Sequence, residues 1–271
     1  MSKVWFITGS SKGFGRVWAE AALERGDRVA ATARDTTTLD DLVQRHGDAI
    51  LPIALDVTDH DADVAAVRQA HERFGRLDVV VNNAGYGLFG TVEEVDEAQA
   101  RAQIETNLLG ALWVTQAALP IMREQGSGHI IQVSSIGGVN AFPGLGLYHA
   151  SKWGLEGFSQ ALAGEVAGFG IGVTIVEPSG FSTDWAGPSA IRAEPLAAYE
   201  PVREAMAARR SGATPGDPDA TAEAILRLVD SDDPPLRVFL GDVGLPMMRD
   251  EYARRLETWE AWQEVAVGAQ G

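Results

Sequence analysis

The chain has 271 residues, a formal net charge of −16 and no cysteine. This acid surplus argues against nucleic acid or an anionic membrane as a partner, because both require a basic face. Disulfides and thiolate metal sites are excluded, and the five histidines lack metal-ligand spacing, so no metal is expected. The N-terminus lacks the pattern of a cleaved leader, and no apolar run approaches the roughly 20 residues of a membrane helix. We therefore expect a cytoplasmic protein that does not enter a membrane.

Short apolar runs follow one another along the chain, separated by amphipathic stretches. The runs do not alternate apolar with polar residues, which is typical of parallel strands buried on both faces. The expected strands are Val4–Thr8, Arg28–Ala33, Ile50–Leu55, Val79–Asn82, His129–Val133, Gly172–Glu177 and Leu236–Leu240. The expected helices include Gly15–Arg25, Asp61–Phe74, Glu97–Met122 and Tyr148–Phe169. This order predicts an α/β fold with a doubly wound parallel sheet of about seven strands and helices on both faces.

Two segments break this rhythm. Residues 180–218 are rich in Gly, Pro and Ala, have no strand signal, and leave the sheet after the sixth strand. Loops there overhang the ligand in open α/β folds, so we predict a mobile substrate lid with two short helices in Ala190–Arg210. Residues 246–267 carry Tyr252, Leu256, Trp259 and Trp262 at near-helical spacing, which predicts a packed C-terminal helix. Without a low-complexity linker or an internal repeat, residues 1–271 are interpreted as a single domain.

The first predicted strand runs into a glycine-rich turn, Thr8-Gly9-Ser10-Ser11-Lys12-Gly13-Phe14-Gly15. Gly9 permits a tight turn, Gly13 lets the backbone approach a pyrophosphate, and Gly15 lets the helix pack closely on the sheet. The N-terminus of the helix offers free N–H groups and a positive dipole end to phosphates. Such a turn is a weak signal alone, but its position between strand and helix predicts a dinucleotide-binding Rossmann fold.

The spacing Gly-x-x-x-Gly-x-Gly resembles the short-chain dehydrogenase/reductase family, and further motifs extend the resemblance over nearly the whole chain. These motifs are Asn82-Asn83-Ala84-Gly85, Asn107 in the following helix, Ser134-Ser135, Tyr148-His149-Ala150-Ser151-Lys152, and Pro178-Ser179-Gly180-Phe181-Ser182-Thr183. One departure is Ser179, where the family usually has glycine, and it puts the local loop shape in question. The resemblance implies hydride transfer between a nicotinamide cofactor and a carbonyl or alcohol substrate. We also expect a homodimer or a homotetramer.

Tyr148 and Lys152 are four residues apart and would share one face of a helix. A free tyrosine has a pKa of about 10, too high for efficient acid–base catalysis at neutral pH. A nearby ammonium group favours the phenolate and lowers that pKa. The pair is therefore predicted to deliver a proton to a developing alkoxide. The chain has only three lysines, Lys3, Lys12 and Lys152, so Lys152 is not a generic solubilising residue here.

Two polar residues are expected to complete the catalytic group. Ser135 lies 13 residues before Tyr148, just past the fifth strand, and is predicted to hold the substrate oxygen. Ser134 is the alternative, and the family's spacing favours Ser135. By the resemblance, Asn107 orients backbone and a water joined to Lys152.

The resemblance also implies a set of cofactor-binding residues. They are Gly9, Ser11, Lys12, Gly13, Phe14, Gly15, Arg34, Asp56, Val57, Asn83, Ala84, Gly85, Tyr148, Lys152, Pro178, Gly180 and Thr183. NAD enzymes place an acidic residue near the end of the second strand, where this chain has Ala33 followed by Arg34. Arg34 and Lys12 could pair a 2′-phosphate, which predicts NADP(H). The neighbouring Asp35 could weaken this effect, and the alternative is that both cations are solvated loop charges.

Phe89, Phe142, Leu145 and Trp185 are the candidates for the wall of the substrate pocket. An aromatic wall favours a bulky, largely apolar ketone, aldehyde or secondary alcohol. The alternative is that these side chains only pack the lid onto the body or onto a neighbouring subunit. Two other functions are considered: an NADP-binding regulator without turnover, which would typically lack the Tyr/Lys pair, and an isomerase or epimerase, whose relatives are usually longer.

Overall fold

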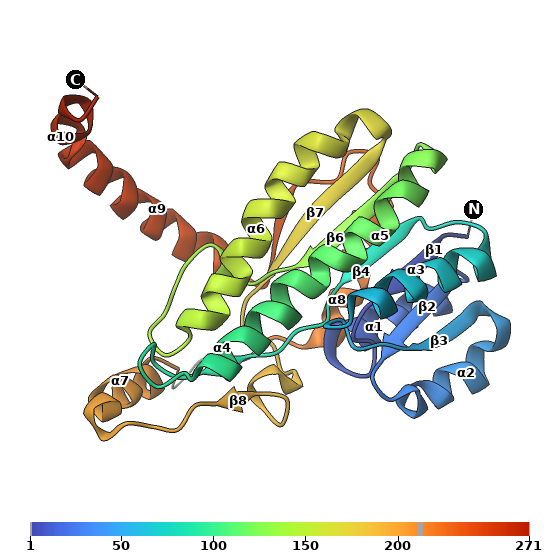
Figure 1. The fold of residues 1–271 in the computed structure, drawn as a ribbon, viewed down its shortest axis with the longest axis horizontal. Helices are drawn as coiled ribbons and strands as arrows, with labels where there is room; N and C mark the ends of the chain where they lie inside the picture. Colours follow the sequence, from blue (N-terminus) through green and yellow to red (C-terminus); the bar gives the residue numbers. More distant parts are fainter. Residues whose placement is uncertain (1, 211–213, 271) are drawn as a thin grey trace.

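The fold is known from a computed structural model that describes residues 2–210 and 214–270. Its strands are β1 (Val4–Ile7), β2 (Arg28–Ala33), β3 (Ile50–Ala54), β4 (Val79–Asn82), β5 (Leu88–Phe89), β6 (Gly128–Val133), β7 (Ile171–Pro178), β8 (Ile191–Arg192) and β9 (Arg237–Leu240). Seven of them form one parallel sheet in the order β3-β2-β1-β4-β6-β7-β9, while β5 and β8 pair separately. Figure 1 shows the run from β3 to β7 in this sheet. The predicted doubly wound α/β fold is confirmed.

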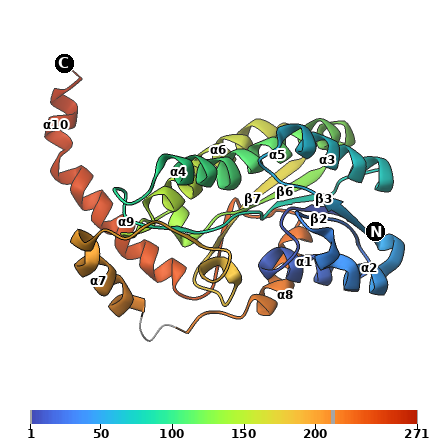
Figure 2. The same ribbon diagram turned by 60° about the horizontal axis from the view of Figure 1, so that its bottom comes forward.

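Helices cover both faces of this sheet (Figure 2). They are α1 (Gly13–Glu24), α2 (Asp40–His46), α3 (His60–Phe74), α4 (Glu97–Ile104), α5 (Gly110–Gln125), α6 (Gly146–Val166), α7 (Glu200–Arg210), α8 (Thr221–Val229), α9 (Gly244–Ala261) and α10 (Gln263–Gly268). Val4 and Phe6 of β1 pack into the core under α3, α5 and α6, whereas Trp5 and Ile7 pack into the core under α1, α2 and α8. Burial on both faces explains why the strands are continuously apolar.

The single helix expected over Glu97–Met122 is interrupted. The α4 helix ends at Ile104, a π-helical segment occupies Glu105–Leu109, and α5 continues to Gln125. Apolar periodicity cannot reveal one wide turn, because the pattern on either side stays close to helical. Such π segments occur frequently at functional sites, and this one contains Asn107.

The predicted lid, residues 180–218, is more ordered than its composition suggested, although residues 211–213 lie outside the described residues. The expectation that it has no strand was wrong, because β8 pairs with β5. The two expected helices are a 3-10 turn over Ala197–Tyr199 and α7, which follow one another directly. Glu94 anchors this part of the lid by accepting from the backbone N–H of Leu196 (2.8 Å) and pairing with Arg203.

The predicted C-terminal helix forms as two helices that meet at Trp262, and the expectation that its apolar residues are packed was wrong. The α9 and α10 helices extend away from the body of the molecule (Figures 1 and 2). Along them Tyr252, Leu256, Trp259 and Trp262 are 45%, 52%, 62% and 65% exposed. Spacing predicts which residues share a helix face but not whether another surface covers that face. No helix in the described part of the chain is long and apolar enough to cross a bilayer.

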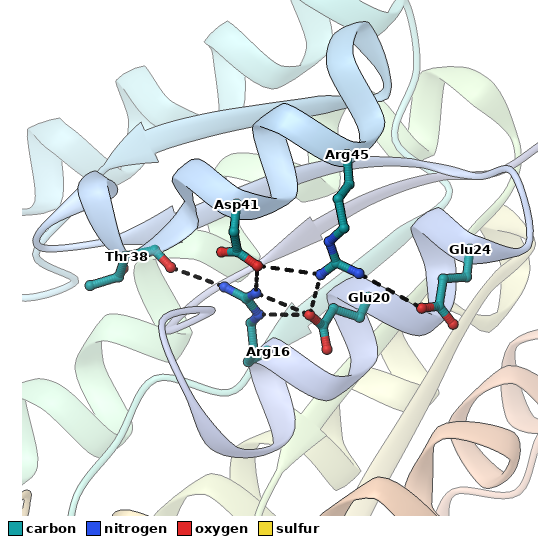
Figure 3. Close-up of polar contacts among 6 residues, drawn as sticks. All are labelled: Arg16, Glu20, Glu24, Thr38, Asp41 and Arg45. Atoms are coloured by element: carbon teal, nitrogen blue, oxygen red, sulfur yellow. Dashed lines mark hydrogen bonds and ion pairs between the residues drawn. The ribbon is translucent and has the colours of Figure 1, made fainter.

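A polar network joins α1, which follows the glycine-rich turn, to the segment that follows β2 (Figure 3). Arg16 pairs with Glu20 on its own helix and with Asp41 of α2, and it donates to the carbonyl oxygen of Thr38 at 2.9 Å. Arg45 of α2 pairs with Glu20 in return, at 2.6 Å. The network fixes the backbone after Arg34 relative to the glycine-rich turn, and both belong to the predicted cofactor site.

Candidate active site

The carboxyl ends of the parallel strands lie along one edge of the sheet, and the strand order reverses between β1 and β4. In open α/β sheets, ligands bind in the crevice at such a switch point. The loops that follow β1, β4, β6 and β7 carry most of the predicted site residues, and α6 adds Tyr148 and Lys152.

The glycine-rich turn has the shape that its sequence requires. Gly9 and Gly13 have φ values of 68° and 59°, which favour glycine. A Cβ at Gly15 would lie 2.5 Å from both the carbonyl oxygen of Gly9 and Nδ2 of Asn83, so no side chain fits there. Asn83 holds the turn through Nδ2, which donates to the carbonyl oxygens of Thr8 (2.9 Å) and Gly9 (3.0 Å).

Thr8 is a positioning residue that the sequence analysis missed. Its Oγ1 accepts from the backbone N–H groups of Asn83 (2.9 Å) and Ala84 (3.0 Å), so it joins the loop after β4 to the glycine-rich turn. The available signal was a hydroxyl residue at the carboxyl end of β1. Only the strand pairing shows that the loop after β4 lies beside it.

The start of α1 fits a bound anion. Lys12 occupies the N-cap position without a capping side-chain hydrogen bond, and the first turn contains no acidic residue. The first N–H groups of the helix and its dipole are therefore available to a pyrophosphate. The ring of Phe14 packs inward against Trp18 and Phe181, at centroid distances of 5.4 and 5.1 Å, so Phe14 can offer only its backbone to a cofactor. These features fit the dinucleotide predicted from the sequence.

The beginning of the lid lies over this turn. A Cβ at Gly13 would be 3.7 Å from the side chain of Thr183, and Nζ of Lys12 pairs with the carboxylate of Asp184 at 2.7 Å. Lys12 is therefore engaged with the lid. Pro178 ends β7, and Gly180 is exposed. The side chain of Ser179 has room because residue 241 is glycine: a Cβ there would lie 2.2 Å from Ser179 Oγ.

On the adenosine side, Arg34 is exposed and makes no hydrogen bond or ion pair within the described residues. The neighbouring Asp35 accepts from the backbone N–H (3.0 Å) and hydroxyl (2.7 Å) of Thr37, which lowers its pKa. Asp56 makes the same turn with Thr58, at 3.1 and 2.8 Å, and Val57 is buried. Asp35 is thus occupied by its own turn.

Tyr148, Ser135 and Lys152 come together at the carboxyl end of β6. Tyr148 is 5% exposed; burial raises its pKa to about 12, and a hydrogen bond from the Ser135 hydroxyl opposes this shift. Lys152 is also 5% exposed, and its Nζ donates to the carbonyl oxygen of Val133 at 2.7 Å. Burial lowers the pKa of Lys152 to about 8, opposed by the charge of Glu156.

The two neighbouring serines point to different places. The hydroxyl of Ser135 faces the phenol of Tyr148. The same Oγ accepts from the backbone N–H of Gly137 at 3.0 Å. Ser134 is buried beside Glu156 instead, and its hydroxyl lowers the pKa of that carboxyl group. The geometry therefore favours Ser135 over Ser134 as the partner of Tyr148.

Asn107 is buried in the π-helical segment and clamps the backbone of Tyr86. Its Oδ1 accepts from the Tyr86 N–H at 3.1 Å and its Nδ2 donates to the Tyr86 carbonyl at 3.0 Å. Nδ2 also donates to Oγ of Ser151 at 3.3 Å, a contact that the sequence analysis missed. A Cβ at Gly85 would lie 3.1 Å from Asn107 Oδ1 and 3.7 Å from Lys152 Nζ, so the two side chains approach each other across Gly85.

The predicted pocket wall is brought together in part. The Trp185 ring lies against Tyr148 and Phe89, at centroid distances of 4.9 and 5.2 Å, and Leu145 is buried immediately before α6. Phe142 instead pairs with the ring of His149 at 5.4 Å.

His149 has a structural role. Its Nε2 accepts from the backbone N–H of Phe142 and its Nδ1 donates to the carbonyl of Gly137, both at 2.9 Å. The burial of this ring lowers the pKa of His149, which keeps it neutral. No group of three His, Asp or Glu side chains that could hold a metal occurs in the described part of the chain.

Known proteins resemble this chain over nearly its whole length. The family model for short chain dehydrogenases matches residues 3–192. The oxidoreductase BOA17 of Botryotinia fuckeliana is 44% identical over 278 aligned residues, covering 99% of this chain and 100% of that protein. The crystal structure of a short-chain dehydrogenase from Streptomyces avermitilis is 40% identical, with a TM-score of 0.91 over 99% of this chain and 98% of that one. An alcohol dehydrogenase from the archaeon Thermococcus sibiricus, solved with 5-hydroxy-NADP, is 27% identical, with a TM-score of 0.75 over 90% and 98% of the two chains.

The chain therefore belongs to the short-chain dehydrogenase family and is an oxidoreductase. The matched residues include the glycine-rich turn, Asn107, Ser135, Tyr148 and Lys152.

Proposed function

We propose that this protein uses NADP(H) to interconvert a carbonyl and an alcohol, with a bulky, largely apolar ketone, aldehyde or secondary alcohol as substrate. The observation that carries the proposal is the group formed by buried Tyr148 and Lys152 with half-buried Ser135, beside the sheet's switch point. A dinucleotide held by the glycine-rich turn would supply or accept the hydride through its nicotinamide.

The side chains divide the remaining work. The hydroxyl of Ser135 holds the substrate oxygen, and the phenol of Tyr148 delivers the proton as negative charge develops on that oxygen. Burial alone raises the pKa of Tyr148, so a nearby positive charge is needed to favour its ionised form. The ammonium of Lys152, one helical turn away, provides that charge. Trp185 and Phe89 form the apolar wall beside the phenol.

The test of the catalytic assignment is Tyr148→Phe, which keeps the ring and removes the ionisable oxygen. We expect turnover to fall at least 10²-fold, on the order of a lost general acid, with the dissociation constant of NADPH nearly unchanged. Lys152→Ala should impair both turnover and cofactor affinity. Tyr252→Phe, far along α9, is the matched control. A Tyr148→Phe variant that retained wild-type kcat on a good substrate from a panel of hydrophobic carbonyls would overturn the mechanism.

The preference for NADP(H) is supported by three features of the adenosine side. Ala33 brings no carboxylate, Arg34 is exposed, and Asp35 is held by its own turn. Arg34→Ala would remove a charge-assisted contact to the 2′-phosphate, which only NADPH carries. The variant is therefore expected to bind NADPH about 10-fold or more weakly and to bind NADH unchanged. Arg68→Ala, an exposed arginine of α3, serves as control. Tighter binding of NADH than of NADPH to the wild-type protein would contradict the assignment.

A further inference from the structure

A buried charged cluster lies directly behind Lys152, away from the substrate. Glu156 of α6 and Glu177 of β7 are 5% and 1% exposed. Arg237 of β9 donates through Nε to Glu156 Oε2 at 3.0 Å and lies 3.5 Å from Glu177 Oε1. Because Tyr148, Lys152 and Glu156 are spaced by four residues, they share one face of α6.

Glu156 is the carboxyl group whose charge acts on Lys152. Lys152 makes no ion pair with a carboxylate in the described part of the chain, and its single bonded partner is the carbonyl of Val133. Gly138 leaves the room that Glu156 occupies, because a Cβ there would lie 3.0 Å from Cγ of Glu156 and 2.3 Å from the Ser134 hydroxyl. The space behind the catalytic lysine is therefore shaped around this carboxyl group.

Two buried carboxyl groups share one guanidinium, so they cannot ionise equally. Burial raises the pKa of both acids, and the charge of Glu156 adds to the shift at Glu177, whose pKa reaches about 8. Glu156 has more support for its charge, because Arg237 donates to it and the Ser134 hydroxyl and the Lys152 ammonium also lower its pKa. Glu156 is accordingly the carboxylate and Glu177 the neutral acid.

We propose that the Glu156 carboxylate is a positioning residue that keeps Lys152 in its ammonium form, while Glu177 stays a neutral acid beside Arg237. This role rests on the function proposed above, since it acts through the Tyr148–Lys152 pair. The charged and titratable groups around Lys152 are Tyr148 and Glu156 on α6, Glu177 on β7 and Arg237 on β9. A cleft of about 230 Å³ reaches Glu177 and Arg237 from the side of α9, so Glu177 can exchange its proton with solvent apart from the substrate site.

The test is the pH dependence of turnover in Glu156→Gln, which replaces a carboxylate by an amide of the same shape. Loss of the anion makes the Tyr148–Lys152 pair release its first proton at lower pH. We expect the alkaline limb of carbonyl reduction and the acid limb of alcohol oxidation both to move down by about one pH unit. A merely structural role would lower kcat or the thermal midpoint without moving either limb.

Glu177→Gln and Glu165→Gln are the matched controls. The first replaces a neutral acid by a neutral amide, and the second changes an exposed acid of the same helix. Neither is expected to move the limbs. The proposal is overturned if Glu156→Gln folds and keeps the wild-type limbs, or if Glu177→Gln shifts them as far.

A second variant covers the case in which Glu156→Gln does not fold. Glu156→Met with Arg237→Met removes the buried ion pair as a unit, which proteins often tolerate. It must also move the limbs to lower pH, because Glu156 and not Arg237 acts on Lys152. Unmoved limbs in an active double variant would sink the proposal. If Tyr148→Phe loses turnover but Glu156→Gln keeps the wild-type limbs, this inference alone is wrong. If Tyr148→Phe keeps full turnover, the proposed function is wrong.

Discussion

Asp63 lies in the first turn of α3, fully buried, with no hydrogen bond to either carboxyl oxygen. Burial, with a smaller contribution from the charges of Asp59 and Asp56, raises its pKa to about 8. The folded protein therefore holds a proton that the unfolded chain has already released above its ordinary pKa of 3.8. Stability contributed at this site is greatest at low pH and falls as the pH rises from about 4 to about 8.

Asp63→Asn removes this titration and is predicted to stabilise the protein in a pH-dependent way. The variant should match the wild type near pH 4 and exceed its free energy of unfolding by roughly 5 kcal/mol near pH 8. Urea unfolding at several pH values measures the difference. Asp61→Asn, an exposed neighbour in the same turn, should show no such trend. A difference between Asp63→Asn and wild type that is constant with pH would contradict the prediction.

At the scale of elements, three consecutive lid residues span the site. Thr183 lies over Gly13, Asp184 pairs with Lys12, and Trp185 covers the ring of Tyr148. The lid therefore contacts both the glycine-rich turn and the catalytic tyrosine. Its middle part is fixed by Glu94, whose pKa falls to about 2 because the backbone N–H groups of Thr91 and Leu196 donate to it.

Trp185→Ala tests whether the lid forms the substrate wall. The truncation removes the ring that faces Tyr148 and leaves the start of α1 intact, so it should separate substrate from cofactor binding. We expect KM for a hydrophobic ketone to rise by about 10-fold, in line with a lost apolar contact of 1–3 kcal/mol, at unchanged NADPH affinity. Leu196→Ala, an exposed lid position, is the control. Unchanged KM and kcat across several substrates would make the lid a structural cover only.

At the scale of the whole molecule, the arm formed by α9 and α10 exposes large apolar side chains to solvent. From Tyr252 onward its large apolar residues are about half exposed or more, and exposed apolar patches commonly mark interfaces. We propose that a second copy of this chain covers the arm in the expected homodimer or homotetramer. Such an interface would bury aromatic anchors, which dominate association energies.

The double variant Trp259→Ser and Trp262→Ser is predicted to lower the mass of the assembly measured by light scattering toward that of one chain. Since both side chains are exposed within one chain, the fold of the isolated chain should not depend on them. Val92→Ser, an exposed apolar residue of the body, controls for surface polarity. Full assembly in the double variant would place the subunit interface elsewhere.

The sequence by itself determined where the main strands lie along the chain and the chemical type of the site. Period and burial of the strands are local properties, so Val4–Ile7 and its successors were readable from the chain. The glycine-rich turn was predictable for the same reason, since Gly9 and Gly13 are required by the positive φ of their own backbone. The spacing of Tyr148 and Lys152 fixed their shared helix face. The roles of the individual site residues and the preference for NADP(H) stay predictions.

Tertiary structure decided what depends on surfaces that meet from distant parts of the chain. The bond of Thr8 to the loop after β4 and the contact of Arg237 with Glu156 join residues about 75 and 81 positions apart. The π-helical turn at Asn107 and the buried acid at Asp63 likewise follow from packing that no periodicity encodes. The apolar face of α9 is the opposite case, because the structure leaves exposed a face that the sequence predicts to be packed. Spacing sets which side chains share a face, whereas burial depends on whether another surface covers it.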